Sequence, residues 1–194
     1  NWGKNIRLSI FGESHGPAIG MVVDGLPAGM VLDEEAIARE MERRAPGRNK
    51  MSTQRREGDK VRILSGFYQG KTTGGPLCGV IENTNQRSGD YGALEQLPRP
   101  GHADYAGAVR FSGCNDPRGG GHFSGRLTAP LVFAGAIAKQ WLSGQGVETG
   151  GHVLSAGGLW DDAFDPCATG KETLAKLREM ELPVLRAEAG KDMR

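Results

Sequence analysis

The chain has 194 residues and carries 24 Lys and Arg against 23 Asp and Glu, so its formal net charge is +1 at pH 7. This balance gives no overall signal for nucleic acid or an acidic membrane surface, and the hydrophobic share of 38% is typical of a globular protein. No run approaches the roughly 18 apolar residues that a membrane-spanning helix needs. Since no basic-then-apolar signal segment opens the sequence, we expect one cytoplasmic domain over residues 1–194, with no membrane and no nucleic-acid partner.

The three cysteines are odd in number and far apart in the sequence. This pattern argues against a disulfide framework and fits a reducing compartment. The sequence also lacks the Cys-x-x-Cys and His-Glu-x-x-His spacings that bind zinc, so we expect no metal site.

Residues 6–11 alternate between polar and apolar side chains and predict a strand, and residues 19–23 predict a second strand that returns beside it. The turn between them carries Glu13, Ser14 and His15. A histidine has an ordinary pKa of about 6.5, so at a strand end it can give or take a proton near neutral pH. The alternative for His15 is an ordinary turn residue whose ring bonds to the backbone.

Asp33 is a good N-cap for a helix that runs from Glu34 to about Arg44. The segment 39–62, which overlaps the end of this helix, holds nine Lys and Arg against four Asp and Glu. Its Pro and Gly residues predict a loop, and three interpretations of that loop stay open. It is a solvated charged loop, a nucleic-acid-binding loop, or a loop that folds over a polyanionic small substrate, since the planar Arg fork matches phosphate and carboxylate.

Residues 61–66 and 77–82 predict the two strands of a further hairpin. Farther along, His102 follows a Pro-Gly turn and comes two residues before Asp104. A carboxylate beside an imidazole orients the ring and raises its pKa, so this pair is a second candidate for proton chemistry. A structural histidine is the alternative.

The three consecutive glycines at 119–121 precede an apolar stretch at 131–142, which predicts a helix buried on nearly every side. Glycines let the backbone take conformations barred to other residues and approach a bulky ligand closely. A loop that ends at a helix N-terminus also offers free N–H groups, and Arg118, His122 and Arg126 add charge or titratable donors. We expect an anion site here, above all for phosphate, with a simple glycine turn as the alternative.

Beyond that helix, residues 147–157 predict a strand. Residues 171–180 predict an amphipathic helix with Leu174 and Leu177 on one side. Pattern alone therefore indicates a chain that mixes helices and strands.

Several short segments give a combined signal that none of them gives alone. They are Phe11-Gly12-Glu13-Ser14-His15-Gly16, Thr53-Gln54-Arg55-Arg56-Glu57, Ile81-Glu82-Asn83-Thr84-Asn85-Gln86-Arg87-Ser88, Arg99-Pro100-Gly101-His102-Ala103-Asp104, and Gly119-Gly120-Gly121 with Ser124-Gly125-Arg126 and Ala136-Ile137-Ala138-Lys139. In this combination, and in register from about Gly3 to the end, the sequence resembles the chorismate synthase family.

The resemblance implies an enzyme of the shikimate pathway that converts 5-enolpyruvylshikimate 3-phosphate to chorismate and phosphate by a 1,4-anti elimination. It implies a requirement for reduced FMN, with NADPH as an indirect reductant, although the reaction has no net redox change. It also implies an α+β fold, a β-α-β sandwich of antiparallel sheets with helices, and a homotetramer whose partner is the small-molecule substrate.

For the catalytic residues, the resemblance implies that His15 protonates the departing phosphate and that His102 protonates or stabilises the reduced flavin. Basic residues in the 39–62 segment receive binding roles. The resemblance assigns Arg44 and Lys50 to NADP(H) or anion binding, and the substrate is expected at Ser14, Arg48 and Arg56.

The flavin-binding stretch of the family aligns with His122, Phe123 and Ser124, of which only Ser124 matches the commoner form, and Arg126 follows it. The family's chains are also longer than this one, and their second halves supply further flavin contacts. We therefore expect the 194-residue chain, incomplete at its C-terminus, to bind FMN poorly and not to turn over on its own. The alternatives are a non-catalytic anion- or nucleic-acid-binding module that uses the 39–62 loop, or an inactive fragment of the enzyme.

Overall fold

The computed structural model describes residues 3–45, 59–84 and 97–194. Its internal contacts group into two compact units, Asn1–Gln140 and Trp141–Arg194, and each unit is described here by itself. The single domain expected over residues 1–194 stays a prediction.

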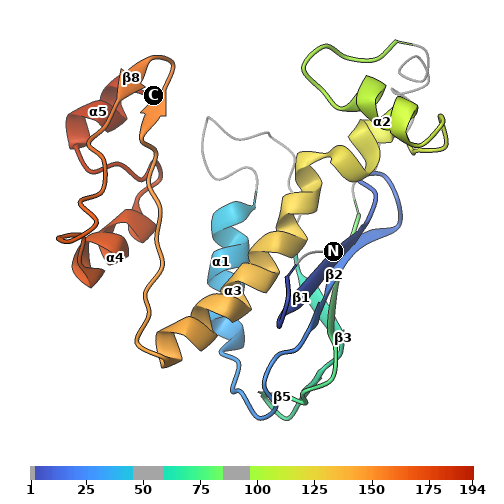
Figure 1. Ribbon diagram of the computed structural model, residues 1–194, viewed down its shortest axis with the longest axis horizontal. Coiled ribbons are helices and arrows are strands. Elements are labelled where there is room, and N and C mark those ends of the chain that lie inside the picture. The colour runs from blue at the N-terminus through green and yellow to red at the C-terminus, as the bar shows by residue number, and fades with distance from the viewer. Residues whose placement is uncertain (1–2, 46–58, 85–96) are drawn as a thin grey trace. The chain divides into compact units, whose positions relative to one another are not determined.

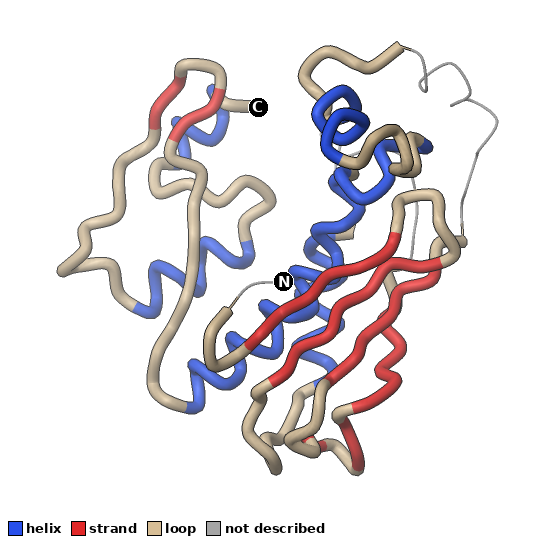
Figure 2. Tube along the Cα trace, turned by 45° about the vertical axis from the view of Figure 1, so that its right-hand side comes forward, coloured by secondary structure: helices blue, strands red, loops and turns tan. Residues whose placement is uncertain are grey.

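The first unit is built on a four-stranded antiparallel sheet with the strand order β1-β2-β6-β3 (Figure 2). These strands are β1 (Arg7–Gly12), β2 (Ala18–Asp24), β3 (Val61–Ser65) and β6 (Leu77–Glu82). Ile19 lies opposite Ile81 and Val23 opposite Leu77, so alternate apolar residues of neighbouring strands share one face. Both strand pairs predicted from the sequence are confirmed, and the short strands β4 (Phe67–Tyr68) and β5 (Lys71–Thr72) form a small hairpin between β3 and β6.

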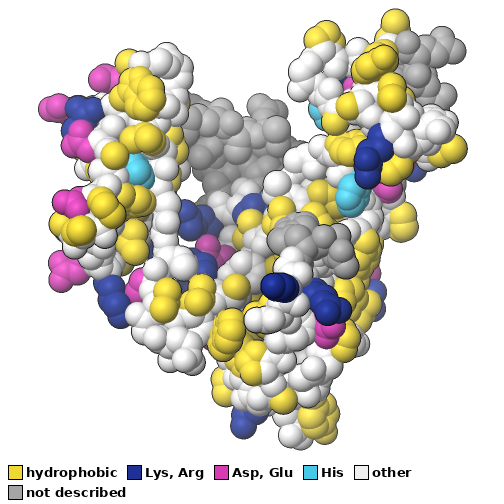
Figure 3. All heavy atoms as spheres, viewed as in Figure 1, with side chains coloured by type: hydrophobic (Ala, Val, Ile, Leu, Met, Phe, Trp, Pro, Cys, Tyr) yellow, Lys and Arg dark blue, Asp and Glu magenta, His cyan; other side chains and the backbone are white. Residues whose placement is uncertain are grey.

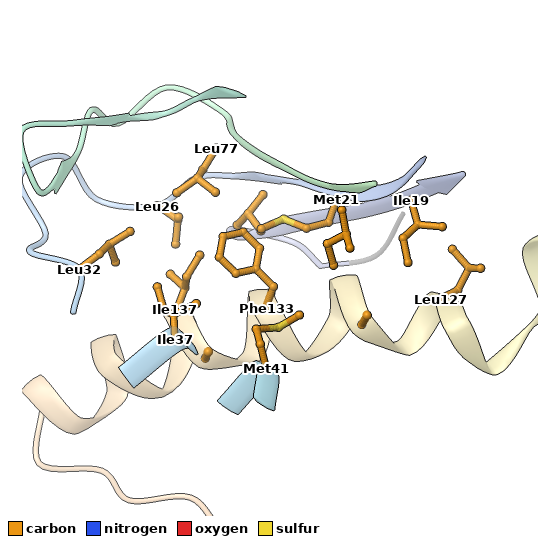
Figure 4. Close-up of a cluster of buried hydrophobic side chains, with 14 residues drawn as sticks. Ile19, Met21, Leu26, Leu32, Ile37, Met41, Leu77, Leu127, Phe133 and Ile137 are labelled. Carbon is orange, nitrogen blue, oxygen red and sulfur yellow. The ribbon is translucent and has the colours of Figure 1, made fainter. Parts of the chain in front are cut away.

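Two helices, α1 (Glu34–Arg44) and α3 (Thr128–Gly144), cover the apolar face of this sheet (Figure 1). The predicted cap of α1 is confirmed, because the Asp33 carboxylate accepts a hydrogen bond of 2.9 Å from the Ala36 N–H. Figure 4 shows the side chains of the two helices pointing toward those of the strands. The buried cluster consists of Ile19, Met21, Val23, Leu26, Leu32, Ile37, Met41, Leu77, Ile81, Leu127, Ala129, Phe133, Ala136 and Ile137.

The helix expected over 131–142 exists, but its burial differs from the prediction. Its fully buried positions, such as Phe133 and Ile137, face the sheet, whereas Trp141 is 36% exposed. The difference arises because, within the first unit, the sheet and α1 pack against one side of α3, while an all-round apolar helix needs cover on every side.

Helix α2 (Asp104–Arg110) and the 3₁₀ turns η2 (Arg118–Phe123) and η3 (Gly125–Leu127) lie beside the first residues of α3 (Figures 1 and 2). Phe123 joins them, because its ring packs on Gly107 of α2, where a Cβ would lie only 2.5 Å from the ring. These segments follow one another along the chain and meet the loop between β1 and β2, so the fold brings the sequence motifs to one end of the sheet.

The second unit holds the short strand pair β7 (Ser155–Ala156) and β8 (Leu159–Trp160) and the helices α4 (Lys171–Glu179) and α5 (Ala187–Asp192). The amphipathic helix predicted at 171–180 is confirmed as α4, and its Leu177 is buried. The strand predicted at 147–157 is wrong except at Ser155–Ala156. The backbone groups of this segment make other hydrogen bonds. The Arg178 guanidinium donates to the Thr149 carbonyl at 2.6 Å, and the Val153 N–H donates to the Pro183 carbonyl at 2.8 Å.

Antiparallel strands and helices in separate layers confirm the predicted α+β class. Within the part of the chain that the structure describes, no helix is both long and apolar enough to cross a membrane.

Candidate active site

The centre of the candidate site is a turn of three glycines that all have left-handed backbone conformations. Their φ values are 58° for Gly119, 86° for Gly120 and 52° for Gly121. Residues with a Cβ reach this region only at a cost, and three such residues in a row are accessible to glycine alone. The turn is therefore specified by the sequence rather than merely tolerated in it.

Each of the three glycines lies against a different polar side chain of the site. A Cβ on Gly119 would lie 2.2 Å from Cε1 of His15, and one on Gly120 would lie 2.4 Å from Cε1 of His102. A Cβ on Gly121 would lie 2.9 Å from Oε2 of Glu13. Two histidines that are far apart in the sequence are thus brought to adjacent residues of a single turn.

His15 is held deep in the site by the loop between β1 and β2. Its side chain is nearly inaccessible, with 4% of the residue exposed, and its Nδ1 lies 3.2 Å from the hydroxyl of Ser14, which is also buried. The Ser14 backbone N–H donates to the Gly121 carbonyl at 3.1 Å and fixes the loop to the glycine turn. The structure therefore supports a positioned histidine over an ordinary turn residue.

His102 forms the pair with Asp104 that the sequence predicted. Its Nδ1 lies 2.6 Å from Oδ1 of Asp104, whose other oxygen accepts a hydrogen bond of 2.8 Å from Nε of Arg99. Hydrogen bonds from the Arg99 guanidinium hold the pKa of the Asp104 carboxyl well below its usual range. Because an ionised carboxylate only accepts hydrogen bonds, Nδ1 of His102 donates, and Nε2 is the nitrogen beside Gly120.

The carboxyl group of Glu13, which lies against Gly121, has a raised pKa, in contrast to that of Asp104. Burial raises the pKa of its carboxyl group, against the influence of His122, and the carboxylate of Asp116 adds to the increase. Asp116 itself is held ionised, because hydrogen bonds from Arg118, including one of 2.7 Å from Nη2, lower the pKa of its carboxyl group. The site thus contains carboxyl groups whose environments push their pKa values in opposite directions.

A cavity of about 510 Å³ opens on the side of the glycine turn that faces α2, and both Gly120 and Asp104, which contact His102, lie in its wall. This volume lies within the range of small-molecule and cofactor sites. Its walls combine aromatic and apolar side chains with a few polar groups and consist of Pro98, Asp104, Tyr105, Ala108, Gly113, Asn115, Asp116, Pro117, Gly120 and Phe123.

The predicted flavin stretch is divided between several roles in the structure. Phe123 lines the cavity and is 38% exposed. His122 has its Nδ1 3.0 Å from the carbonyl of Gly12, and Ser124 caps η3 by accepting from the Arg126 N–H at 3.3 Å. Among these residues, Phe123 is the one that the structure places on the cavity wall.

Arg44 and Arg126, both expected to bind cofactor, are paired with one buried carboxylate. The two oxygens of Asp59 each accept from one of these guanidinium groups, and Asp59 is 4% exposed. Arg126 also donates to the Asn83 side-chain oxygen at 3.2 Å. Arg48, Lys50 and Arg56 lie outside the described residues.

Sequence reasoning missed Asp59, Asn83, Arg99 and Asp116. Arg99 and Asn83 stand inside segments that contributed to the family resemblance, and Asp116 precedes Arg118 by two residues, so each had a local signal. Asp59 gave none, because its partners lie 15 and 67 residues away.

Replacing Gly120 with alanine tests the packing of the turn, and Gly70→Ala is its matched control. Gly70 has a similar φ of 77°, but nothing lies within 4 Å of its missing Cβ. Both variants incur the left-handed backbone penalty of about 1–2 kcal/mol. We expect Gly120→Ala to lose about 1–3 kcal/mol more in chemical denaturation, because it also collides with His102. Equal losses in the two variants would contradict the contact.

Replacing Asp104 with asparagine tests the ionised carboxylate that orients His102. Its lowered pKa means that its stabilisation is complete above the ordinary aspartate pKa of about 3.9 and is lost as the pH falls further. We expect Asp104→Asn to reduce the free energy of unfolding by about 1.5–3 kcal/mol at pH ~7 and by a smaller amount at pH ~2.5, with the difference narrowing further at lower pH. The exposed Asp24→Asn should have little effect at either pH. A penalty for Asp104→Asn that is independent of pH would refute the assignment.

Comparisons with known proteins agree on one family. The family model for chorismate synthase matches residues 6–194. Chorismate synthase of Albidiferax ferrireducens is 57% identical over 141 residues, which cover 73% of this chain and 38% of the relative. That of Thiobacillus denitrificans is 51% identical over 167 residues, which cover 82% and 45%.

A crystal structure of chorismate synthase superposes with a TM-score of 0.68 at 28% identity and covers 97% of this chain and 51% of that one. The matches to the Albidiferax and Thiobacillus proteins cover 38% and 45% of those relatives, so the chain spans less than half of their length. The matched residues include the glycine turn and both histidines that it brings together. This chain belongs to the chorismate synthase family.

Proposed function

We propose that this chain supplies the histidine half of a chorismate synthase active site. The reaction is the 1,4-anti elimination of phosphate from 5-enolpyruvylshikimate 3-phosphate, which gives chorismate. The single observation that supports it is the placement of His15 and His102 against adjacent glycines of one turn. The elimination needs one group that stabilises the charge on the departing phosphate and, near it, a second group that assists the loss of hydrogen.

In this proposal His15 assists the departure of phosphate. As the C–O bond breaks, negative charge grows on the phosphate oxygens, and a protonated imidazole at that position neutralises it by giving a proton. The buried loop position of His15 supports this role, because a site that excludes water strengthens the interaction of the cation with the developing charge.

His102 acts on the other side of the turn in this proposal. Asp104 holds the ring through Nδ1 and leaves Nε2 beside Gly120, which lines the cavity. Because Asp104 engages Nδ1, Nε2 is the ring nitrogen that faces the side of Gly120 and can exchange a proton with a reduced ring system bound there.

The cavity on the α2 side of the glycine turn fits the flavin that the family implies. Gly120 brings backbone without a side chain to its wall, and Phe123 and Tyr105 supply aromatic walls for a planar ring system. These two residues would hold the ring. Reduced FMN, if bound there, would supply transient electron density and take up the C6 hydrogen.

The same proposal includes NADPH as an indirect reductant, a homotetramer and a cytoplasmic location. It also keeps Ser14, Arg48 and Arg56 as substrate contacts and Arg44 and Lys50 as anion contacts. The nucleic-acid module is not favoured, because the comparisons agree on an enzyme family. Within each unit taken by itself, the described part of the face in Figure 3 shows Lys and Arg side chains beside acidic and hydrophobic ones.

The test is anaerobic turnover of 5-enolpyruvylshikimate 3-phosphate with reduced FMN by the complete polypeptide that contains these residues. We expect His15→Ala and His102→Ala each to lower the rate of phosphate release by roughly 10²- to 10⁴-fold. Flavin absorbance changes on adding substrate report binding separately from turnover.

His152→Ala is the control, because none of the sequence motifs includes His152 and its ring is engaged within its own unit, with Nε2 2.8 Å from the Asp162 carbonyl and its centroid 4.2 Å from that of Phe164. It should leave turnover unchanged. Turnover of both site variants at the parent rate would refute the proposed roles.

A further inference from the structure

A buried asparagine at the end of β6 holds the loop that carries His15. The side-chain amide of Asn83 donates to the Glu13 carbonyl at 3.0 Å and to the Gly16 carbonyl at 2.8 Å. Its backbone N–H donates to the Pro17 carbonyl at 3.1 Å. One residue therefore fixes the backbone on both sides of Ser14 and His15, and only 9% of that residue is exposed.

The orientation of this amide is itself fixed from the other side. The Asn83 side-chain oxygen accepts from Nε of Arg126, and Arg126 is paired with the Asp59 carboxylate. Asp59 also binds Arg44 at the end of α1. Its φ of 36° is unusual for a residue with a Cβ, and strain of this kind persists where the surroundings over-determine it.

We propose that Asn83 is a positioning residue for His15, locked in place by the Asp59–Arg126 ion pair. Its catalytic meaning rests on the proposed function, but the placement does not. Without the amide, the carbonyls of Glu13 and Gly16 each lose a donor, and these two ties between the loop and the end of the sheet are gone. His15 then opens away from Gly119 more often, and the imidazole loses its fixed place relative to His102.

The experiment measures how fast diethyl pyrocarbonate acylates each histidine, read peptide by peptide by mass spectrometry. His15 is nearly inaccessible, so it reacts through opened states of the loop, whereas His122 is exposed and serves as an internal reference. We expect Asn83→Ala to raise the rate at His15 relative to His122 by roughly tenfold. Asp59→Asn, which removes the charge that holds Arg126, should raise it by a smaller factor.

Gln140→Ala is the matched control. Like Asn83, Gln140 uses its amide to join distant segments, since it accepts from the Asp33 N–H and donates to the Asp33 carbonyl, each at 2.9 Å. It lies away from the His15 loop, so its loss should lower stability without changing the rate at His15. A general loosening of the fold would instead accelerate acylation in both variants.

An Asn83→Ala protein whose His15 rate stays within about twofold of the parent rate contradicts the proposal, and so does an equal acceleration by Gln140→Ala. If Asn83→Ala does not fold, Asn83→Ser decides by the same criteria, because it keeps one donor and should give an intermediate rate.

In the complete polypeptide, the same variants should lower kcat more than they change KM. If the acylation rates follow the expected pattern but the parent protein shows no turnover, the proposed function is refuted and the role of Asn83 in holding the loop stands.

Discussion

Steric exclusion at three successive left-handed glycines is the constraint on which the site depends. Gly119 and Gly120 have no side chains, and the imidazoles of His15 and His102 fill the space where those side chains would stand. Because the glycines are neighbours in the chain, the histidines are neighbours in space, whatever their separation in sequence. The turn itself therefore holds the two rings near each other.

The rest of the first unit keeps that turn in place. The four-stranded sheet ends where the His15 loop begins, and α3 starts just after the turn and packs through Phe133 onto the sheet. Hydrogen bonds between polar side chains also hold the residues around the turn. Arg99 orients Asp104 beside His102, and Arg126 orients Asn83 beside the His15 loop. Apolar packing sets the distances within the fold, and the charge-assisted hydrogen bonds set the directions of the site side chains.

The features that could be predicted from the sequence are those whose causes are local. The Asp33 cap, the paired strands and the closeness of His102 to Asp104 follow from neighbouring residues, and the structure contains all three. The Asp59–Arg126 pair joins residues 67 positions apart and depends on how the residues before β3 meet η3, which no local pattern encodes. The extended segment predicted near Val153 failed for the same reason, because a distant loop takes its backbone groups.

The most direct measurement is the set of nuclear Overhauser effects between the histidine rings and the glycine turn. The account predicts cross-peaks from Hε1 of His15 to the Hα protons of Gly119 and from Hε1 of His102 to those of Gly120, because each Cε1 lies where a glycine Cβ would stand. Cross-peaks that link either ring only to other parts of the chain, with the turn assigned and its signals sharp, would contradict the convergence of the two imidazoles.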